Sequence, residues 1–423
     1  MSRTIFSRPT SARRWIFSKN ELAQDRLIAV DQIARWSMNL KHGLQLAYCT
    51  NVHRGETWAQ TFDSLEKYSL AVKERVSPNR PFAIGLRLSN QAAFELNGDS
   101  LYAFKRWLEK NDCYIFTING FPYGQFHGAR VKEQVYRPDW AAPERLDYTK
   151  RLFDLLVELL PPEAEGSVST LPGSFKEFVS GEEYERRIRN QIWECVEHVA
   201  MLSERTGRKL HLGVEPEPLG WFENTAETLH FFERMRAEHP EDDRLGRHLG
   251  VNYDACHFAV EFEEAGEALR NFELHGIKLS KIHLSSAMKL KPTEMARKNL
   301  EAFADDVYLH QVVARSPDGS RRIFKDLRPA LDAAKHESAD EEWRVHFHVP
   351  LHSPGAAWYE TTVEHALGVL NYLKSNPQQC RHLEMETYTW EVLPEALKSR
   401  TVVDQLAAEY EWTLAKMAER DLA

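Results

Sequence analysis

Residues 249–258 read LGVNYDACHF, a short apolar run that ends in Asp254 and is followed three positions later by His257. Residues 210–217, LHLGVEPE, repeat the pattern, because an apolar run there ends in Glu215. Short runs of this kind are typical of buried strands. The chain contains nine of them, at residues 44–50, 82–88, 113–119, 167–170, 210–215, 249–254, 279–284, 343–349 and 382–387.

Helical patterns separate most of these runs. In residues 181–206, Tyr184, Ile188, Ile192 and Cys195 recur every three or four positions, with Glu and Arg between them, as expected for one buried helix face. Strands that alternate with helices indicate βαβ units and a parallel sheet. Eight such units close a barrel of roughly 250 residues. We therefore predict an α/β fold, a (β/α)8 TIM barrel, with one of the nine runs outside it.

The 423 residues exceed what such a barrel needs. The excess is expected in an N-terminal arm, in residues 120–140, and in residues 288–342, where Asp318-Gly319 is typical of a hairpin turn. No linker or repeat marks a second domain. The predicted organisation is an arm at 1–43 and a single barrel domain at 44–423.

The composition excludes several functional classes. The net charge of −9 disfavours binding to nucleic acid or to an anionic membrane surface. No apolar run is long enough to span a membrane. The five cysteines are scattered without CxxC spacing, which indicates reduced, mostly buried thiols and a cytoplasmic location. The sequence also lacks the G-x-S-x-G, phosphate-loop and G-x-G-x-x-G motifs of serine hydrolases, P-loop NTPases and dinucleotide-binding enzymes.

Polar side chains end four of the predicted strands. Glu215, Asp254, His283 and Glu386 each follow or close an apolar run. The carboxyl ends of barrel strands face the active site, and converging carboxylates are tolerated when a cation neutralises them. The four residues are therefore predicted to ligate one divalent ion. Mixed oxygen and nitrogen ligands suit Mn²⁺, Mg²⁺, Co²⁺ or Zn²⁺, and the set alone does not choose among them.

Some neighbouring residues leave alternatives open. Glu217 and Glu384 each lie two positions from a chosen ligand, and they would share its strand face. They remain candidates for supporting or substrate-contacting groups, and Glu384 for the last ligand. Residues 345–352, VHFHVPLH, place His346 and His348 on one face of a predicted strand. His348 is expected to face the pocket as a substrate or supporting group.

The long segment after the third strand supplies further candidates for ligand contacts. Asn119 ends the strand, Tyr123 lies in the glycine-rich stretch that follows, and His127, Lys132 and Tyr136 come later in the segment. These residues are expected to shape a pocket rim and to contact an anionic or hydroxylated ligand. An ordered surface loop without a ligand explains them equally well.

The strand ends resemble the metal-binding strand ends of xylose-isomerase-like sugar epimerases. The matching stretches are VEPEPL at 214–219, DACHF at 254–258, IH at 282–283 and ETY at 386–388. The resemblance implies that Glu215, Asp254, His283 and Glu386 are ligands and that His257 contacts substrate. The long interval between the last two ligands departs from the epimerase pattern, since it holds an additional strand and a hairpin.

Four longer phrases resemble the metabolite traffic protein EboE family. They are YCTNVH at 48–53, FTINGFPYG at 116–124, VKEQVYRPDW at 131–140 and EMETYTW at 384–390. That family resembles a xylose-isomerase-like barrel and is encoded with a prenyltransferase-like protein and a TatD-like hydrolase. The resemblance implies a small-molecule metabolite as ligand, other proteins of the same pathway as partners, and a role in moving secondary-metabolite precursors.

Three functions follow as hypotheses. In a metal-dependent isomerase or epimerase, Glu215 and Glu386 would act as base and acid across an enediolate, while His257 stabilises the developing oxyanion. A metal-dependent phosphoesterase would usually need further metal ions and a basic track for the phosphate. A metabolite-binding protein without catalysis would bind its ligand tightly and leave it unchanged.

Overall fold

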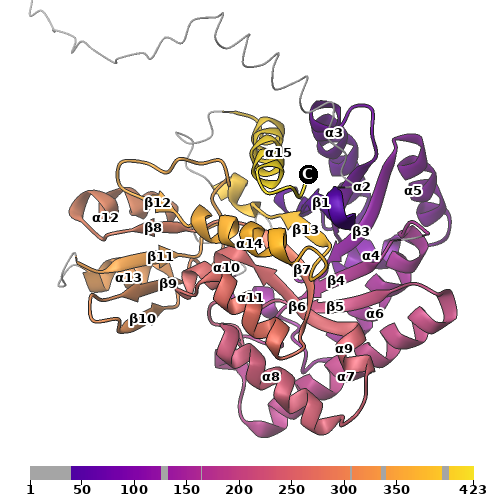
Figure 1. Cartoon of the computed structure of the whole chain (residues 1–423), viewed down its shortest axis with the longest axis horizontal. Coiled ribbons are helices and arrows are strands. Elements are labelled where there is room, and N and C mark those ends of the chain that lie inside the picture. Colours follow the sequence, from indigo (N-terminus) through magenta and orange to yellow (C-terminus); the bar gives the residue numbers. More distant parts are fainter. Residues whose placement is uncertain (1–39, 125–131, 163, 305–306, 335–339, 393–399) are drawn as a thin grey trace, which may run out of the picture.

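The fold is described from a computed structural model that covers residues 40–124, 132–162, 164–304, 307–334, 340–392 and 400–423 (Figure 1). The greater part of the predicted N-terminal arm, residues 1–39, lies outside the described residues, as does His127.

A parallel sheet forms the centre of the molecule. Within the described residues it contains eight strands in the order β1-β13-β7-β6-β5-β4-β3-β2. A parallel bridge between Cys49 and Gly85 joins β1 to β2 and brings the sheet round on itself. The chain is therefore a (β/α)8 TIM barrel, as predicted. The strands are β1 Gln45–Tyr48, β2 Phe82–Arg87, β3 Cys113–Asn119, β4 Gly166–Thr170, β5 Leu210–Val214, β6 Leu249–Asp254, β7 Lys278–Leu284 and β13 His382–Met385.

Helices surround this sheet (Figure 1). The longest, α7, buries Ile188, Ile192 and Cys195, the face predicted from their spacing. It ends at Gly207, whose φ of 69° is the left-handed conformation that glycine adopts without strain. The helices around the barrel are α2 Trp58–Ser64, α3 Leu70–Val76, α4 Asn90–Glu95, α5 Gly98–Lys110, α6 Pro143–Leu159, α7 Glu182–Thr206, α8 Thr225–Glu238, α9 Arg244–His248, α10 Ala255–Val260, α11 Ala265–Leu274, α14 Val363–Ser375 and α15 Val402–Ala418.

A second sheet is inserted between β7 and β13. Its described strands run in the order β10-β9-β11-β8-β12, all antiparallel. The predicted hairpin is confirmed, because β9 and β10 pair across Asp318-Gly319. The run at 343–349 is the one outside the barrel, since its first residues form β11. The inserted elements are β8 Met288–Leu290, α12 Glu294–Leu300, β9 Val312–Arg315, β10 Arg321–Phe324, α13 Leu327–Ala333, β11 Glu342–Val345 and β12 Glu360–Thr361.

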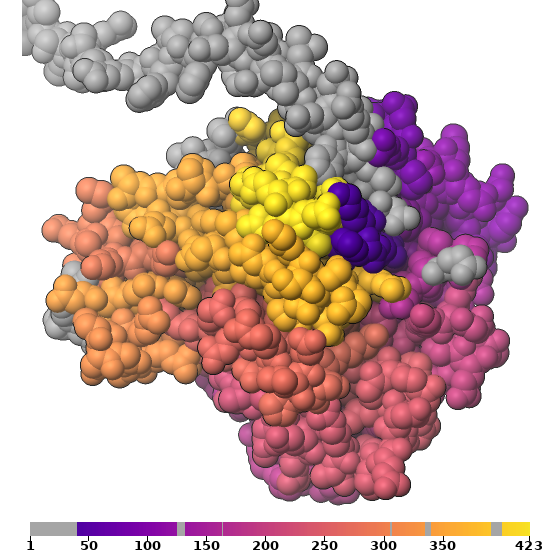
Figure 2. Space-filling view, in the orientation of Figure 1, coloured from indigo at the N-terminus to yellow at the C-terminus, as the bar shows by residue number. Residues whose placement is uncertain are grey.

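The insertion has a hydrophobic core of its own. Met288, Leu300, Val312 and Trp343 belong to a buried cluster separate from that of the barrel. In Figure 2 the orange atoms of this segment form a lobe on one side of the molecule. The chain leaves β7 at the carboxyl end of the barrel strands, so the insertion begins beside the edge where the predicted ligands lie.

Candidate metal centre and its cavity

The four predicted ligands lie together. Their ligand atoms are all within 4.8 Å of one another, and all four side chains are buried. Glu215 directly follows β5, Asp254 ends β6, His283 lies in β7 and Glu386 directly follows β13. Since all these strands are parallel, their carboxyl ends meet at one mouth of the barrel. This is the spatial arrangement that the strand-end pattern predicted.

The imidazole of His283 is at the centre of this group. Its Nδ1 lies 3.0 Å from Glu215 Oε1, 3.3 Å from Asp254 Oδ2 and 2.9 Å from Glu386 Oε2. Burial alone would lower the pKa of His283, but Glu386 and Glu215 outweigh it and hold the pKa well above its usual value. A protonated imidazole thus supplies the positive charge that the three carboxylates require.

The donor set fits a divalent cation. Asp254 Oδ2 is buried and has no hydrogen-bond partner among the described residues, and an oxygen of this kind is costly unless something neutralises it. A cation among the carboxylates would take over the charge of the His283 proton and leave Nδ1 as a nitrogen ligand. Three carboxylates and one imidazole suit Mn²⁺, Co²⁺ or Zn²⁺ at least as well as Mg²⁺.

Asp254 is held in place by the helix that follows it. Its Oδ1 accepts hydrogen bonds from the backbone N–H groups of Cys256 and His257, at 2.7 and 3.1 Å, and from Ser285 Oγ at 2.6 Å. Asp254 is therefore the N-cap of α10, a common role for aspartate. Burial would raise the pKa of Asp254, but His257, His348 and His283 hold it well below its usual value.

Glu384 takes a supporting position beside His283. Its Oε2 lies 2.9 Å from His283 Nε2 and accepts a hydrogen bond of 2.6 Å from Lys281 Nζ. Burial would raise the pKa of Glu384, but Lys281 and His283 lower it to about 2. A carboxylate on the far nitrogen of a ligating histidine fixes the tautomer and orientation of the ring. Glu384 therefore orients His283, and Glu386 is the candidate ligand.

Gly85 on β2 leaves the space that Glu384 occupies. A Cβ at this position would overlap Glu384 Oε1 and lie 2.6 Å from the backbone oxygen of Tyr48. We expect Gly85→Ala to displace Glu384 from His283 and to weaken metal binding by about 10–100-fold, the usual effect of losing such a supporting group. Metal titration of the purified variant measures this loss.

Gly246→Ala is the matched control, because a Cβ there meets no heavy atom of the described residues within 4 Å. It should leave metal affinity unchanged. Equal affinity of Gly85→Ala and the wild type would show that Glu384 does not support His283.

Two asparagines hold Glu386. Asn51 Nδ2 donates a hydrogen bond of 2.6 Å to Glu386 Oε1, and Asn119 Nδ2 lies 3.5 Å from the same oxygen. Burial raises the pKa of Glu386, against the opposing effect of His283. Asn51 was not predicted as a site residue, although it directly follows the first apolar run and the strand-end criterion could have found it. Asn119 was predicted to contact substrate, and it lies beside a candidate ligand.

A cavity that leaves about 70 Å³ for the centres of water-sized molecules lies over the ligands. Its described walls come from three sources: the ends of barrel strands, the segment after β3, and the insertion. The lining residues are Asn51, Asn119, Phe121, Pro122, Lys132, Val135, Tyr136, Glu215, Glu217, His257, Tyr308, Leu309, Gln311, His346, Glu386 and Tyr388. Nothing in the sequence indicated that Tyr308 and Gln311 of the insertion would reach the cavity.

Of the other residues predicted to contact substrate, some line the cavity and others lie outside it. Glu217 and His257 line the cavity, whereas His348 is buried behind its wall and donates from Nδ1 to the backbone oxygen of Glu386 at 2.9 Å. Lys132 also lines it, but its ammonium bonds Asp326 and the backbone oxygen of Tyr308, at 2.7 and 2.6 Å. Lys132 thus joins the segment after β3 to the insertion.

Tyr123 is not among the described lining residues. Its ring packs edge-on against Tyr148, with the two ring centroids 5.1 Å apart. Tyr123 therefore packs against the residues around the segment after β3.

Glu217 is a third carboxylate of the cavity wall, beside Glu215 and Glu386. Burial, together with the nearby charges of Glu215, Asp254 and Glu386, raises the pKa of Glu217 well above its usual value. Its Oε1 is buried without a hydrogen-bond partner among the described residues. A protonated carboxyl group in a cavity wall can donate a hydrogen bond to a ligand oxygen.

Some solved structures are similar to this chain at low sequence identity. No protein-family model and no curated protein matches the chain. Among solved structures, a xylose isomerase domain protein from Planctomyces limnophilus is 14% identical, with 88% of this chain and 96% of that chain covered and a TM-score of 0.48. A D-tagatose 3-epimerase-like protein is 13% identical, with 88% and 97% covered and a TM-score of 0.47.

The IolI protein, solved with a binding zinc atom, is 12% identical, with 88% and 98% covered and a TM-score of 0.46. The structural neighbours are thus xylose-isomerase-like TIM-barrel proteins. At these identities and TM-scores the likeness carries no information about substrate or mechanism, which have to come from the site itself.

Two predictions from composition can be compared with the structure. The five cysteines are free and buried, as expected. Among the described residues no helix combines the length and apolar content needed to cross a bilayer.

Proposed function

We propose that this chain is a divalent-metal-dependent barrel of the isomerase or epimerase type, acting on a small polar metabolite. The observation that carries the proposal is the convergence of Glu215, Asp254, His283 and Glu386 beneath one cavity at the carboxyl end of the barrel strands. When bound there, a cation supplies a Lewis acid that polarises a carbonyl and lowers the pKa of the neighbouring C–H bond.

The side chains around that position can then move protons. Glu215 and Glu386 follow different strands and both line the cavity, so each can reach a substrate carbon as base or acid. Asn51 fixes the orientation of Glu386 through Oε1 and leaves Oε2 toward the ligand group. Glu217 can donate a hydrogen bond to a substrate oxygen that gains negative charge.

The role expected for His257, stabilising an oxyanion, depends on which of its ring nitrogens carry a proton. Its Nδ1 lies 3.0 Å from the backbone oxygen of Pro216, which can only accept, so the Nδ1 proton is committed to that bond. In the neutral ring Nε2 is then an acceptor. Stabilising an oxyanion through Nε2 would require a second proton on the ring.

The cavity wall favours a neutral polar ligand over a phosphate. Among its described lining residues Lys132 is the single lysine or arginine, and its ammonium already bonds Asp326 and Tyr308. Several carboxylates face the same space. These carboxylates would repel the negative charge of a phosphoester. Phosphoesterase activity is therefore the second candidate function.

The resemblance to the EboE family supports a pathway role. Each of its four phrases contributes residues to the described wall of this cavity. They are Asn51, then Asn119, Phe121 and Pro122, then Lys132, Val135 and Tyr136, then Glu386 and Tyr388. We therefore propose that the ligand is a secondary-metabolite precursor and that other proteins of the pathway deliver or receive it. Carriage without conversion is the competing form of this proposal.

Hydrogen–deuterium exchange tests catalysis even when the overall conversion is slight. Metal-loaded protein is incubated in D₂O with a panel of ketoses, aldoses and polyol-derived ketones, and with any small molecule found on it by native mass spectrometry. We expect deuterium at the carbon beside the carbonyl. Glu386→Gln should reduce the exchange rate by about 10²–10⁴-fold, the usual contribution of a general base.

Glu158→Gln is the control, because Glu158 is an exposed residue of α6. Unchanged exchange in Glu386→Gln would remove that residue from the mechanism. Tight binding without exchange would favour the carrier, and release of phosphate from phosphoesters would favour the phosphoesterase.

A further inference from the structure

A group of potential metal ligands lies at the amino end of the barrel, away from the cavity. The donor atoms of Glu165, His211 and His382 are all within 4.8 Å of one another. Glu165 directly precedes β4, His211 is the second residue of β5 and His382 is the first of β13. The two histidines each lie four residues before a candidate ligand, Glu215 or Glu386. They therefore share the strand face of those ligands, roughly 13 Å further down the barrel.

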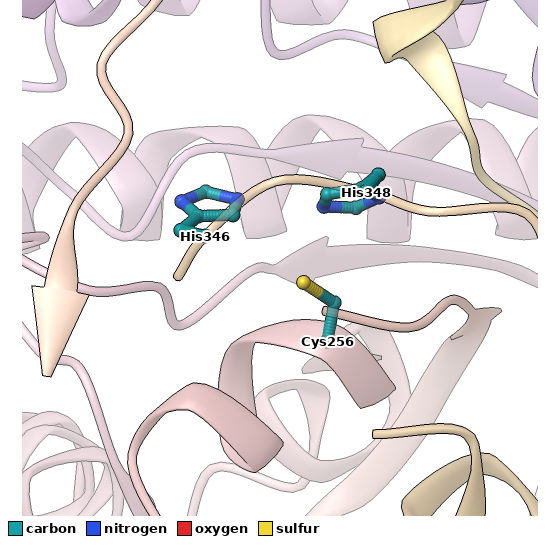
Figure 3. Close-up of side chains that lie close together, drawn as sticks. All are labelled: Cys256, His346 and His348. Atoms are coloured by element: carbon teal, nitrogen blue, oxygen red, sulfur yellow. The ribbon is translucent and has the colours of Figure 1, made fainter. Parts of the chain in front are cut away.

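This position separates the amino-end group, Glu165, His211 and His382, from the other groups of this kind among the described residues. Each of the others lies at the carboxyl end of the strands, on or beside the four candidate ligands. One of them consists of Cys256, His346 and His348, with the sulfur directed toward the two rings in Figure 3. The function proposed above makes no use of the amino-end group.

His382 has a ring nitrogen without a partner. Its Nδ1 lies 2.8 Å from Ser167 Oγ, and because that hydroxyl donates to Thr117 Oγ1 at 2.8 Å, the serine oxygen accepts from Nδ1. Burial, with the nearby charges of Lys281 and Lys278, lowers the pKa of His382 to about 3. The ring is therefore neutral at physiological pH, and Nε2 is a lone pair. Nε2 is buried with no hydrogen-bond partner among the described residues.

His211 is held in the same way. Its Nδ1 lies 2.6 Å from Ser280 Oγ, a hydroxyl that can accept the Nδ1 proton and so leave Nε2 as a lone pair. Burial lowers the pKa of His211 well below its usual value. Nε2 lies 3.9 Å from Glu165 Oε2, and the ring centroid lies 5.2 Å from that of His382. An imidazole fixed through one nitrogen, with the other nitrogen toward a carboxylate, has the arrangement of a metal ligand.

The surroundings of Glu165 determine which cation fits. Its Oε1 lies 3.5 Å from Lys209 Nζ and 3.6 Å from Arg381 Nη1. These two side chains are 77% and 47% exposed, so water and salt screen much of their repulsion toward a bound cation. Binding then rests on the imidazole lone pairs more than on charge, which favours Zn²⁺ over Mg²⁺ or Ca²⁺.

A hollow at the same end of the barrel adjoins the group. It leaves about 780 Å³ for the centres of water-sized molecules, and Glu165 and His382 belong to its described lining. Zinc commonly takes four ligands, so three protein ligands leave one position for water or for a small ligand from the hollow.

We propose that Glu165, His211 and His382 bind one Zn²⁺ at the amino end of the barrel. The ion joins β13 to β4 and β5, which are not neighbours of β13 in the sheet. It thereby stabilises the closed barrel, since an ion that binds only the folded chain favours folding, and this end of the fold serves stability. The inference goes beyond the proposed function and does not depend on it, because it uses no residue of the cavity.

The zinc bound per chain tests this site. Chelator-treated full-length protein is titrated with Zn²⁺, and bound metal is measured after removal of the excess. We expect His382→Asn and His211→Asn each to bind one equivalent fewer than the wild type, because asparagine can keep the bond to serine but lacks the second nitrogen. His248→Asn is the matched control and should bind as much as the wild type. His248 is a buried histidine that directly precedes β6, and its Nδ1 lies 2.8 Å from the backbone oxygen of Leu210.

Equal zinc in the wild type, His382→Asn and His211→Asn would overturn the site. A loss of the same size in His248→Asn would also overturn it, because any buried histidine at this end would then have the same effect. Glu165→Gln keeps the test decisive if a histidine variant does not fold, since the Glu165 side chain is 22% exposed. It should weaken zinc binding at this site by at least the roughly 10–100-fold typical of losing a supporting group, and unchanged affinity would contradict the proposal.

Double variants separate this inference from the proposed function. His283→Leu should lose the equivalent at the carboxyl end and keep the amino-end one, and His283→Leu/His382→Asn should lose both. Loss in His382→Asn with none in His283→Leu would support the amino-end site and count against the proposed function. The reverse would overturn the amino-end site and leave the proposed function intact. Cys256→Ala/His382→Asn should bind one equivalent fewer than Cys256→Ala, and no difference would assign the lost zinc to the group in Figure 3 and overturn the proposal.

Lys209→Met tests the charge of the bound species. Removing an ammonium 3.5 Å from the Glu165 carboxylate should tighten zinc binding by about two- to fivefold, the range for an exposed ion pair. The measurement is made in His283→Leu protein, which lacks the other site. Weaker zinc binding in Lys209→Met would show that the positive charge helps the ligand to bind, and it would overturn a cation site.

Discussion

Replacing His283 with leucine should abolish binding at the four-ligand site and, in metal-free protein at neutral pH, lower the free energy of unfolding by about 3–5 kcal/mol. The magnitude is that of removing one partner of a buried ion pair. Without the imidazole, Glu215, Asp254 and Glu386 would be left as buried carboxylates with no positive charge between them. Urea unfolding of chelator-treated protein measures the effect.

The free energy of unfolding of this variant should depend on pH through different groups from those of the wild type. The pKa of His283 is raised in the folded protein, so its stabilisation is complete below the unfolded value and lost as pH rises through the folded one. In His283→Leu the buried carboxylates dominate, with Glu386 already above its usual pKa. The variant should recover stability as pH falls and Glu386 becomes protonated.

His198→Leu on α7 serves as the control, because His198 pairs with Asp154 outside the cavity. This control should leave metal binding unchanged, and it should not gain stability as pH falls. A His283→Leu protein as stable as the wild type without metal would mean that the three carboxylates are not held charged around this ring.

Lys281→Met should lower the free energy of unfolding by a similar amount, about 3–5 kcal/mol. Lys281 and Glu384 form an ion pair in which both side chains are fully buried, with Nζ and Oε2 2.6 Å apart. Ser169 Oγ accepts a further bond from the ammonium at 2.9 Å. The substitution leaves Glu384 charged in the barrel interior, and the double variant Lys281→Met/Glu384→Gln should recover part of the loss.

The change in the free energy of unfolding at low pH reports the contribution of the Lys281–Glu384 ion pair. Because the pKa of Glu384 is lowered to about 2, its contribution is present above the unfolded value of about 4.3 and lost as pH falls through the folded one. That loss should be smaller in Lys281→Met, in which His283 alone still lowers the pKa of Glu384. Lys105→Met, which breaks an exposed pair with Glu158, should change stability very little.

The candidate ligands were predictable because their signal is local. An apolar run that ends in Glu215 or Asp254 identifies both the strand and the end at which the side chain lies. The choice between Glu384 and Glu386 was not local, since both occupy the same strand face. It depends on register: Glu384 pairs with His283 across β13 and β7, which places Glu386 one layer nearer the mouth.

The insertion could not be predicted in the same way from the pattern of apolar residues. Residues 343–349 have the composition of a barrel strand, yet β11 ends at Val345 and joins another sheet. Apolar periodicity reports that a strand is buried and does not report which sheet buries it. The same limit applies to Gln311, whose place in the cavity wall depends on contacts between segments far apart in the chain.

The position of β13 in the sheet has a consequence for how the protein is made. This strand lies between β1 and β7, so β1 cannot pair with one of its two neighbours until the insertion and β13 have also been synthesised. Glu386, which follows β13, arrives at the same late moment. A metal ion would therefore find all four candidate ligands only after β13 has joined the sheet, and metal occupancy would report closed barrels rather than nascent ones.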